Sequence, residues 1–148
     1  MNEKDKFVSY FREIQPKFSH FYATILTHAN LTLPQYALLS ELYRAGTISM
    51  TEISKKLRVS KPAVTSLVDR LEENNFLRRI SHPKDRRIFL LQIQPKGKKL
   101  IRQVQAKILH LLLQALDQFT AEETKVISRF YAFVSQSIDA VLLRSKGV

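Results

Sequence analysis

The sequence predicts a mainly α-helical protein with one small β-hairpin, an α+β fold. Apolar residues recur with the 3.6-residue period of a helix at both ends of the chain, and the period changes to two over residues 76–93. Between these regions, two short helical segments lie only three residues apart. With 148 residues, 45% of them hydrophobic, we expect one folded unit over residues 1–148.

The first helix is expected over residues 7–29, where apolar side chains recur at three- and four-residue steps. Pro16 lies inside this segment. An interior proline removes a backbone hydrogen bond and clashes with the preceding turn. The segment is therefore predicted to kink at Pro16 or to restart there as a second helix.

The next two helices each begin with a capping box, in which a Ser or Thr and a Glu or Gln three residues later bond to each other's backbone N–H groups. Thr32 and Gln35 begin the second helix, and Gly46 ends it. Ser49 and Glu52 begin the third helix.

A fourth helix begins at Ser60 as the N-cap, with Pro62 in its first turn. Because the third helix ends at Leu57, the two helices must cross steeply, as in a helix-turn-helix. Small Ser54 permits their close approach. Arg58 stands in the turn where glycine is the usual left-handed residue, at an expected cost of about 1 kcal/mol.

Two β-like runs follow, over residues 76–81 and 88–93, and the charged segment from His82 to Arg87 connects them. A hairpin with a charged tip directly after a helix-turn-helix is typical of a wing. Residues 31–94 therefore predict a winged helix-turn-helix, the DNA-binding region of the chain.

Two long helices complete the chain, one beginning at Pro95 and the other at the capping pair Thr120 and Glu123. Their apolar stripes are wider than one winged helix can cover, and burying one such side chain is worth about 1.5 to 3 kcal/mol. We therefore expect residues 1–30 and 95–148 to form dimerisation helices that pair two copies of the chain.

The formal net charge of the chain is +11, and it is concentrated in one region. Residues 51–102 contain 14 basic and five acidic side chains, which gives this third of the chain a charge of +9. A basic middle on a nearly neutral frame is typical of a protein that binds double-stranded DNA. The alternative is a solvated basic surface without a partner.

The chain contains no Cys and only three Gly, which excludes thiolate zinc sites, disulfide scaffolds and glycine-rich phosphate loops. Its four His show no i, i+4 pair, and no nucleophile and base are grouped as in an enzyme. We therefore expect neither an enzyme, nor a cofactor, nor a metal site. No leader-like segment follows Met1 and no run of about 18 apolar residues occurs, so we expect a cytoplasmic protein without a membrane partner.

Two segments of the predicted winged helix have a specific pattern, residues 85–97, DRRIFLLQIQPKG, in the wing and residues 59–72, VSKPAVTSLVDRLE, in the fourth helix. They resemble the wing signature and the recognition helix of the MarR family of bacterial and archaeal winged-helix transcription regulators. The resemblance covers essentially the whole chain. It implies a homodimeric repressor or activator, with the recognition helices in successive major grooves and the wings in the minor groove. From one recognition helix in each chain, we expect a pseudo-palindromic operator.

The resemblance also implies roles for individual wing residues. By position, Arg87 enters the minor groove and Asp85 orients it. Arg86 and Lys84 contact phosphates or the edge of the groove.

On the recognition helix, Ser66 stands where many members of the family carry a long basic or amide side chain. We therefore expect base reading to rely on Lys61, Pro62 and Thr65, together with DNA shape. The candidate DNA-binding residues are Ser60, Lys61, Pro62, Thr65, Ser66, Arg70, Lys84, Asp85, Arg86 and Arg87.

Some of these basic and polar residues have a purely structural alternative. Ser60 caps the helix whether or not it contacts phosphate. Arg70 lies three residues before Glu73 and is also placed for a surface ion pair.

Arg78 and Arg79 alternate in the first strand, so that one faces solvent and the other the DNA side.

Members of the family often sense small aromatic or anionic ligands in a cleft between the dimer helices and the winged helix. The corresponding candidates are Phe18, His20, Tyr22 and Tyr36, for which a place in the core is the alternative. We expect a sequence-specific repressor that such a ligand releases from DNA. The alternative function is a winged-helix module for protein interaction, with neither ligand nor operator.

Overall fold

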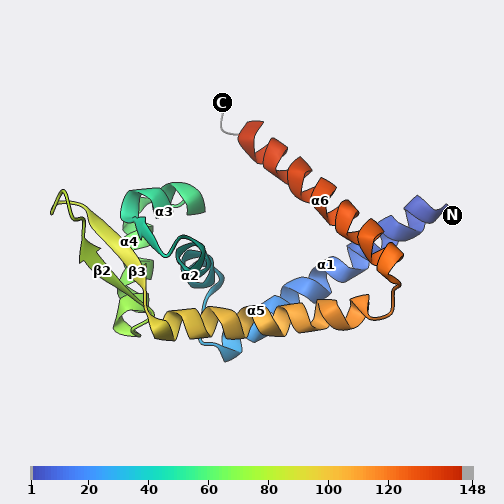
Figure 1. The fold of residues 1–148 in the computed structure, drawn as a ribbon, viewed down its shortest axis with the longest axis horizontal. Helices are drawn as coiled ribbons and strands as arrows, with labels where there is room; N and C mark the ends of the chain where they lie inside the picture. Colours follow the sequence, from blue (N-terminus) through green and yellow to red (C-terminus); the bar gives the residue numbers. More distant parts are fainter. Residues whose placement is uncertain (1, 145–148) are drawn as a thin grey trace. The chain divides into compact units, whose positions relative to one another are not determined.

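The computed structural model describes residues 2–144 and shows a mainly α-helical fold with a small antiparallel sheet (Figure 1). The chain divides into two compact units, Met1–Ile108 and Leu109–Val148, which are described separately. The elements are α1 (Glu3–His28), α2 (Leu33–Ala45), β1 (Thr47–Ser49), α3 (Met50–Leu57), α4 (Lys61–Glu73), β2 (Leu77–Ser81), β3 (Phe89–Ile93), α5 (Pro95–Leu116) and α6 (Ala121–Arg144).

Helix α1 is continuous through Pro16, so the predicted restart at this residue is wrong. Both ends of the helix are fixed, and the loss of one backbone hydrogen bond in the middle does not divide it. At the start, Asn2 and Asp5 form a capping box. At the end, Ile25 and Leu26 are buried in the core.

The predicted caps of α2, α3 and α4 are confirmed. Thr32, Ser49 and Ser60 each accept a hydrogen bond from the backbone N–H three residues later, at 3.4, 3.2 and 3.3 Å. Gly46 ends α2 with φ of 75°, in the left-handed region that glycine adopts without strain. These caps fix the short helices that carry the candidate site.

The sheet has the order β1-β3-β2, and all its pairs are antiparallel. The predicted hairpin strands are confirmed as β2 and β3. Strand β1, which pairs Ile48 with Leu91, was not predicted, because three residues are too few to show a period of two. By pairing with β3, β1 connects the base of the wing to the start of α3.

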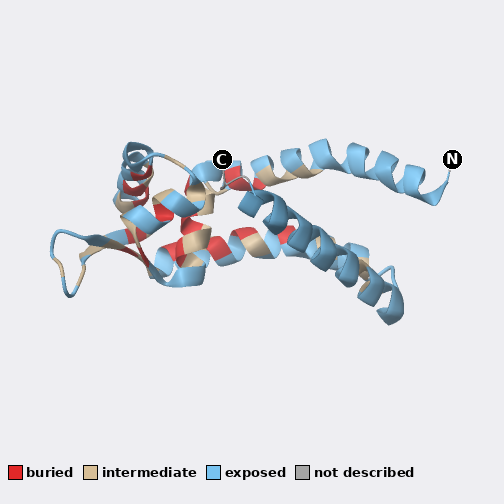
Figure 2. Ribbon diagram, turned by 90° about the horizontal axis from the view of Figure 1, so that it is seen from above, coloured by how far each residue is buried: buried red, intermediate tan, exposed pale blue. Residues whose placement is uncertain are grey.

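One core holds the winged helix together, and Figure 2 shows its buried residues in red. Every element of the first unit contributes at least one buried apolar side chain. The side chains with no exposed area are Leu38, Leu39 and Leu42 of α2, Ile53 of α3, Val64 and Val68 of α4, Leu91 of β3 and Ile101 of α5.

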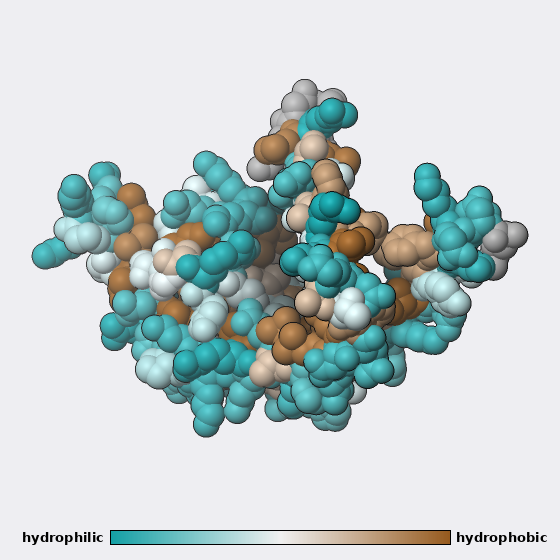
Figure 3. Space-filling model, turned by 45° about the vertical axis from the view of Figure 1, so that its right-hand side comes forward, coloured by the Kyte–Doolittle hydropathy of each residue, from teal (hydrophilic) through white to brown (hydrophobic). Residues whose placement is uncertain are grey.

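In the second unit, α6 begins at the predicted capping box, where Thr120 donates its backbone N–H to Glu123 Oε2 at 2.8 Å. No residue of α6 between Ala121 and Arg144 is buried, and apolar side chains lie along this helix (Figure 3). Among residues 2–144, α6 is also the one helix that is long and apolar enough to cross a membrane, by length and composition alone. A helix whose apolar side meets another protein chain has the same composition.

Candidate nucleic-acid interface

The recognition helix α4 separates an apolar side from a polar side. Val64, Val68 and Leu71 are buried in the core. The predicted DNA-binding residues of this helix and its cap are all exposed, namely Ser60, Lys61, Pro62, Thr65, Ser66 and Arg70. Their spacing places Pro62, Thr65 and Ser66 on one exposed face of the helix. The major groove of DNA is wide enough to admit an α-helix, so this face can reach the edges of the bases.

Two of these residues also form hydrogen bonds at the helix, Thr65 through its side chain and Arg70 through its backbone carbonyl. Thr65 Oγ1 donates to the carbonyl oxygen of Lys61 at 3.0 Å. The carbonyl of Arg70 accepts a hydrogen bond from the Asn74 side chain at 2.8 Å. Thr65 therefore has a structural reason to be polar that the sequence pattern did not reveal.

The turn between α3 and α4 sets the position of the recognition helix. Arg58 has φ of 54° and ψ of 42°, the left-handed conformation that the sequence predicts for this position. Ser54 Oγ donates to the carbonyl oxygen of Val59 at 2.7 Å, and Val59 N–H donates to the carbonyl oxygen of Ser54 at 3.2 Å. Ser54 thus holds the turn by hydrogen bonds in addition to being small.

At the tip of the wing, Asp85 holds Arg87 by three hydrogen bonds. The backbone N–H and Nε of Arg87 donate to Asp85 Oδ1 at 3.0 and 3.2 Å, and an Arg87 guanidinium nitrogen lies 3.4 Å from Asp85 Oδ2. The Arg87 side chain hydrogen bond, followed by its backbone one, lowers the pKa of the Asp85 carboxyl below its ordinary value. The Arg87 side chain is nevertheless 91% exposed.

The rest of the wing tip is also basic. Lys84 and Arg86 are exposed on either side of Asp85. The backbone N–H of Lys84 donates to His82 Nδ1 at 3.2 Å, which tightens the turn. The structure therefore brings all four predicted wing residues to one loop, where Lys84, Arg86 and Arg87 are exposed and Asp85 is half-buried.

The two strand arginines differ in their contacts. Arg78 Nε donates to Gln92 Oε1 at 2.9 Å, across the hairpin. The Arg79 side chain instead extends beyond the hairpin and forms ion pairs with Asp69 and Glu72 of α4. Sequence reasoning missed this link, because the two carboxylates lie seven and ten residues away.

The structure brings together three of the four predicted ligand-binding residues. The ring centroid of Tyr22 lies 6.1 Å from that of Phe18 and 6.2 Å from that of Tyr36. Burial, together with the charge and hydrogen bond of Tyr36, raises the pKa of Tyr22. His20 is exposed on α1, with no ring contact to this cluster.

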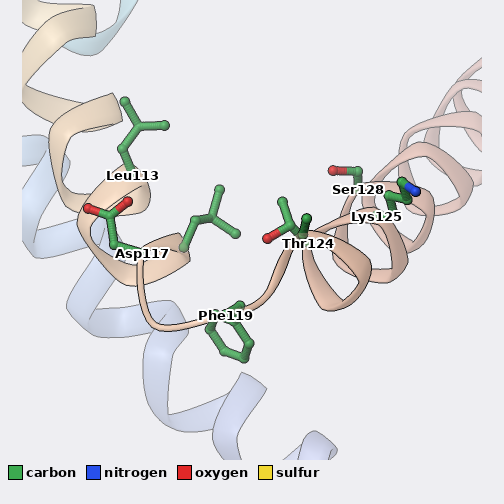
Figure 4. A pocket seen from close by; sticks show the side chains of 8 residues that line it. Leu113, Asp117, Phe119, Thr124, Lys125 and Ser128 are labelled. Carbon is green, nitrogen blue, oxygen red and sulfur yellow. The ribbon is translucent and has the colours of Figure 1, made fainter.

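An open hollow of about 670 Å³ lies elsewhere, within the second unit at the turn between α5 and α6 (Figure 4). Leu113, Phe119 and Thr124 line it, with Asp117 and Lys125 as its charged groups. None of the predicted ligand-binding residues belongs to this hollow. Within residues 2–144, no group of three or more His, Cys, Asp or Glu is placed to hold a metal ion.

The exposed helix and wing define a winged-helix DNA-binding protein, and comparison with known proteins agrees. The model of the MarR family matches residues 31–89. The uncharacterised HTH-type transcriptional regulator YsmB of Bacillus subtilis is 30% identical over 105 residues, which are 71% of this chain and 72% of YsmB.

Solved structures show the same fold. A MarR family protein from Bacillus stearothermophilus is 28% identical with a TM-score of 0.78, over 94% of this chain and 99% of that one. A mutant of S. aureus MepR bound to an oligodeoxyribonucleotide is 21% identical with a TM-score of 0.70, over 89% of this chain and 97% of that one. The chain belongs to the MarR family, and it is a DNA-binding transcription regulator and not an enzyme.

Proposed function

We propose that the chain is a homodimeric repressor that binds a pseudo-palindromic operator in double-stranded DNA. The observation that carries this proposal is the pairing of an exposed polar face on α4 with an exposed, carboxylate-held Arg87 on the wing. One chain offers one such reading unit, which suits one half-site. Two copies related by a two-fold axis then read half-sites whose centres lie about 10 base pairs apart.

In this proposal the candidate residues fall into groups according to the part of the DNA that each contacts. Lys61, Pro62, Thr65 and Ser66 contact base edges in the major groove. Ser60, Arg70, Lys84 and Arg86 contact phosphates, and Arg87 enters the minor groove while Asp85 orients it. A mutant of S. aureus MepR, which has the same fold, is bound to an oligodeoxyribonucleotide, and this supports DNA as the partner.

The exposed apolar surface supports the homodimer. Large apolar residues exposed on α1 and α6 exceed what a monomer usually leaves in water. On α6 they are Val126, Phe130, Tyr131, Phe133, Val134, Ile138, Val141, Leu142 and Leu143. A second copy of the chain, contributing the same helices from residues 1–30 and 95–148, would cover this surface.

An effector is the second part of the proposal. A small anionic or aromatic molecule would bind at Phe18, Tyr22 and Tyr36, where α1 meets α2 next to the winged helix. If it binds the DNA-incompetent state more tightly, DNA must weaken its affinity by the same factor. The proposed place of action is the cytoplasm, where both DNA and metabolites are available.

The test is the substitution Arg87→Ala, with Arg44→Ala as the control, because Arg44 is exposed on α2 and lies outside both the candidate DNA interface and the proposed dimerisation helices. Arg87→Ala is expected to weaken binding to the operator duplex by about 1 to 3 kcal/mol and to leave thermal stability unchanged, because an exposed hairpin tip contributes little to the core. Fluorescence anisotropy at several salt concentrations measures the affinity. A parallel fall in melting temperature would make Arg87 structural, and unchanged affinity would favour the protein-interaction module.

A further inference from the structure

We propose that Arg79 is a positioning residue that locks the wing to the recognition helix, so that Arg87 meets DNA at a fixed distance from the residues exposed on α4. The inference rests on the proposed function, because it concerns the same DNA interface. It concerns a residue of β2 that does not itself need to contact DNA.

The contacts of Arg79 join two elements. Its backbone N–H donates to Glu72 Oε1 at 2.8 Å, and its guanidinium group pairs with Glu72 Oε2. The other guanidinium nitrogen lies 2.5 Å from Asp69 Oδ1. Arg79 therefore holds two carboxylates that lie one helical turn apart on α4.

The position of Arg79 in the sheet explains its direction. Arg79 pairs with Leu91 and lies two residues after buried Leu77, so it shares the core-facing side of the hairpin with them. Its side chain is only 24% exposed. Burial disfavours its charged form, but the hydrogen bonds and the negative charges of Asp69 and Glu72 together outweigh this effect and raise the pKa of the guanidinium group.

Arginine is the residue type that this geometry requires. The planar guanidinium group carries several N–H donors in a fixed fork, so it can hold two carboxylates at once in a defined orientation. A lysine would keep the positive charge but not the fork. The contact therefore fixes an angle between elements, which a point charge would not do.

The angle matters because of what lies further along the hairpin. β2 ends at Ser81, and the tip from His82 to Arg87 follows directly. At the other side of the contact, Asp69 lies one turn after Thr65 on the exposed face of α4. A rotation of the hairpin about its base would therefore move Arg87 relative to Thr65, and the Arg79 contact opposes that rotation.

Arg78 provides a matched control on the same strand. It carries the same charge, but its hydrogen bond to Gln92 stays within the hairpin and does not reach α4. Arg79→Gln is expected to weaken operator binding about tenfold or more, and Arg79→Lys is expected to bind the operator nearly as weakly as Arg79→Gln. Arg78→Gln is expected to change the affinity by less than about threefold. Wild-type affinity in Arg79→Lys would overturn the proposal.

The variant Asp69→Ala separates positioning from simple electrostatics, and it keeps the test valid if Arg79→Gln does not fold. Removing a negative charge next to DNA should strengthen binding if only charge matters. If the Arg79 contact positions the wing, Asp69→Ala weakens binding instead. Tighter binding by Asp69→Ala would therefore contradict the proposal.

A double-mutant cycle with Arg87→Ala gives the final test. If Arg79 acts through the wing, Arg87→Ala should cost much less affinity in the Arg79→Lys background than in the wild type, whereas Lys61→Ala should cost the same in both. Additive effects of the Arg79 and Arg87 substitutions would overturn the positioning role. If Arg87→Ala alone has no effect, the proposed function of the wing fails instead, so the two failures are distinguishable.

Discussion

Gly97 shows how one residue joins α5 to the winged helix. A Cβ atom at this position would lie 2.2 Å from the carbonyl oxygen of Phe76 and 3.0 Å from Cγ1 of Ile93. The same Phe76 oxygen accepts a hydrogen bond from Gln94 N–H at 2.9 Å, and Lys96 Nζ donates to the carbonyl oxygen of Asn74 at 2.9 Å. The first turn of α5 therefore rests directly on the backbone between α4 and β2.

Gly97→Ala is expected to destabilise the protein by about 1 to 3 kcal/mol, because the backbone oxygen of Phe76 cannot move aside as a flexible side chain would. Urea unfolding followed by circular dichroism measures the change. Lys99→Ala, at an exposed position of the same helix, should stay within about 0.5 kcal/mol of the wild type. Equal stabilities of the two variants would contradict the close contact.

For individual residues, the sequence predicted those contacts whose two partners lie near each other in the chain. The Ser49–Glu52 cap follows from short spacing and the Asp85–Arg87 pair from the resemblance to the MarR family, and both contacts are present. The partners of Arg79 could not be predicted, because nothing in the sequence states which face of β2 meets α4. That contact depends on the register between β2 and β3, which only the folded hairpin defines.

Among the elements, α3 is the shortest helix of the reading unit, with eight residues, and depends most on its ends. Hydrogen bonds from the backbone N–H and the hydroxyl of Ser49 lower the pKa of Glu52 from its ordinary value of 4.5. A carboxyl whose folded-state pKa is depressed stabilises the fold above its unfolded-state pKa, and this stabilisation is lost as the pH falls through the folded-state value.

We therefore expect the difference in unfolding free energy between the wild type and Glu52→Gln to shrink as the pH falls from about 6 to about 3. The glutamine keeps the shape of the cap but not its charge, so the two proteins should converge once Glu52 is protonated. Urea unfolding at a series of pH values provides the measurement. A difference that stays constant with pH would show that the charge of Glu52 does not support the cap.

Elements with clear periods were predicted, and those that depend on distant partners were not. The helix period and the capping residues predicted α2, α3, α4 and α6 close to their observed bounds. β1 is defined only by its pairing with β3 and leaves no pattern of its own. Pro16 is a case in which a local rule predicted too much. The rule predicted an interruption of the helix, but the remaining hydrogen bonds keep α1 continuous.

For the whole molecule, α6 raises the question of what covers its apolar side. Its residues Phe130, Phe133, Val134, Ile138 and Val141 are exposed and line one shallow groove along the helix. Polar residues such as Gln136 lie on the opposite side by helical spacing. An amphipathic helix with a continuous apolar stripe favours a protein partner over a lipid bilayer, which would require apolar residues all round.

Ile138→Asp is therefore expected to convert a dimer into a monomer, because it places a charge within the apolar stripe of α6. Operator affinity should fall at least about a hundredfold, since each reading unit would then bind its half-site alone. Gln136→Asp adds the same charge on the opposite side of the helix and should leave both properties unchanged. Analytical ultracentrifugation at micromolar concentration gives the oligomeric state. A wild-type monomer that still binds the full operator tightly would contradict the homodimer, because both reading units would not then be needed at once.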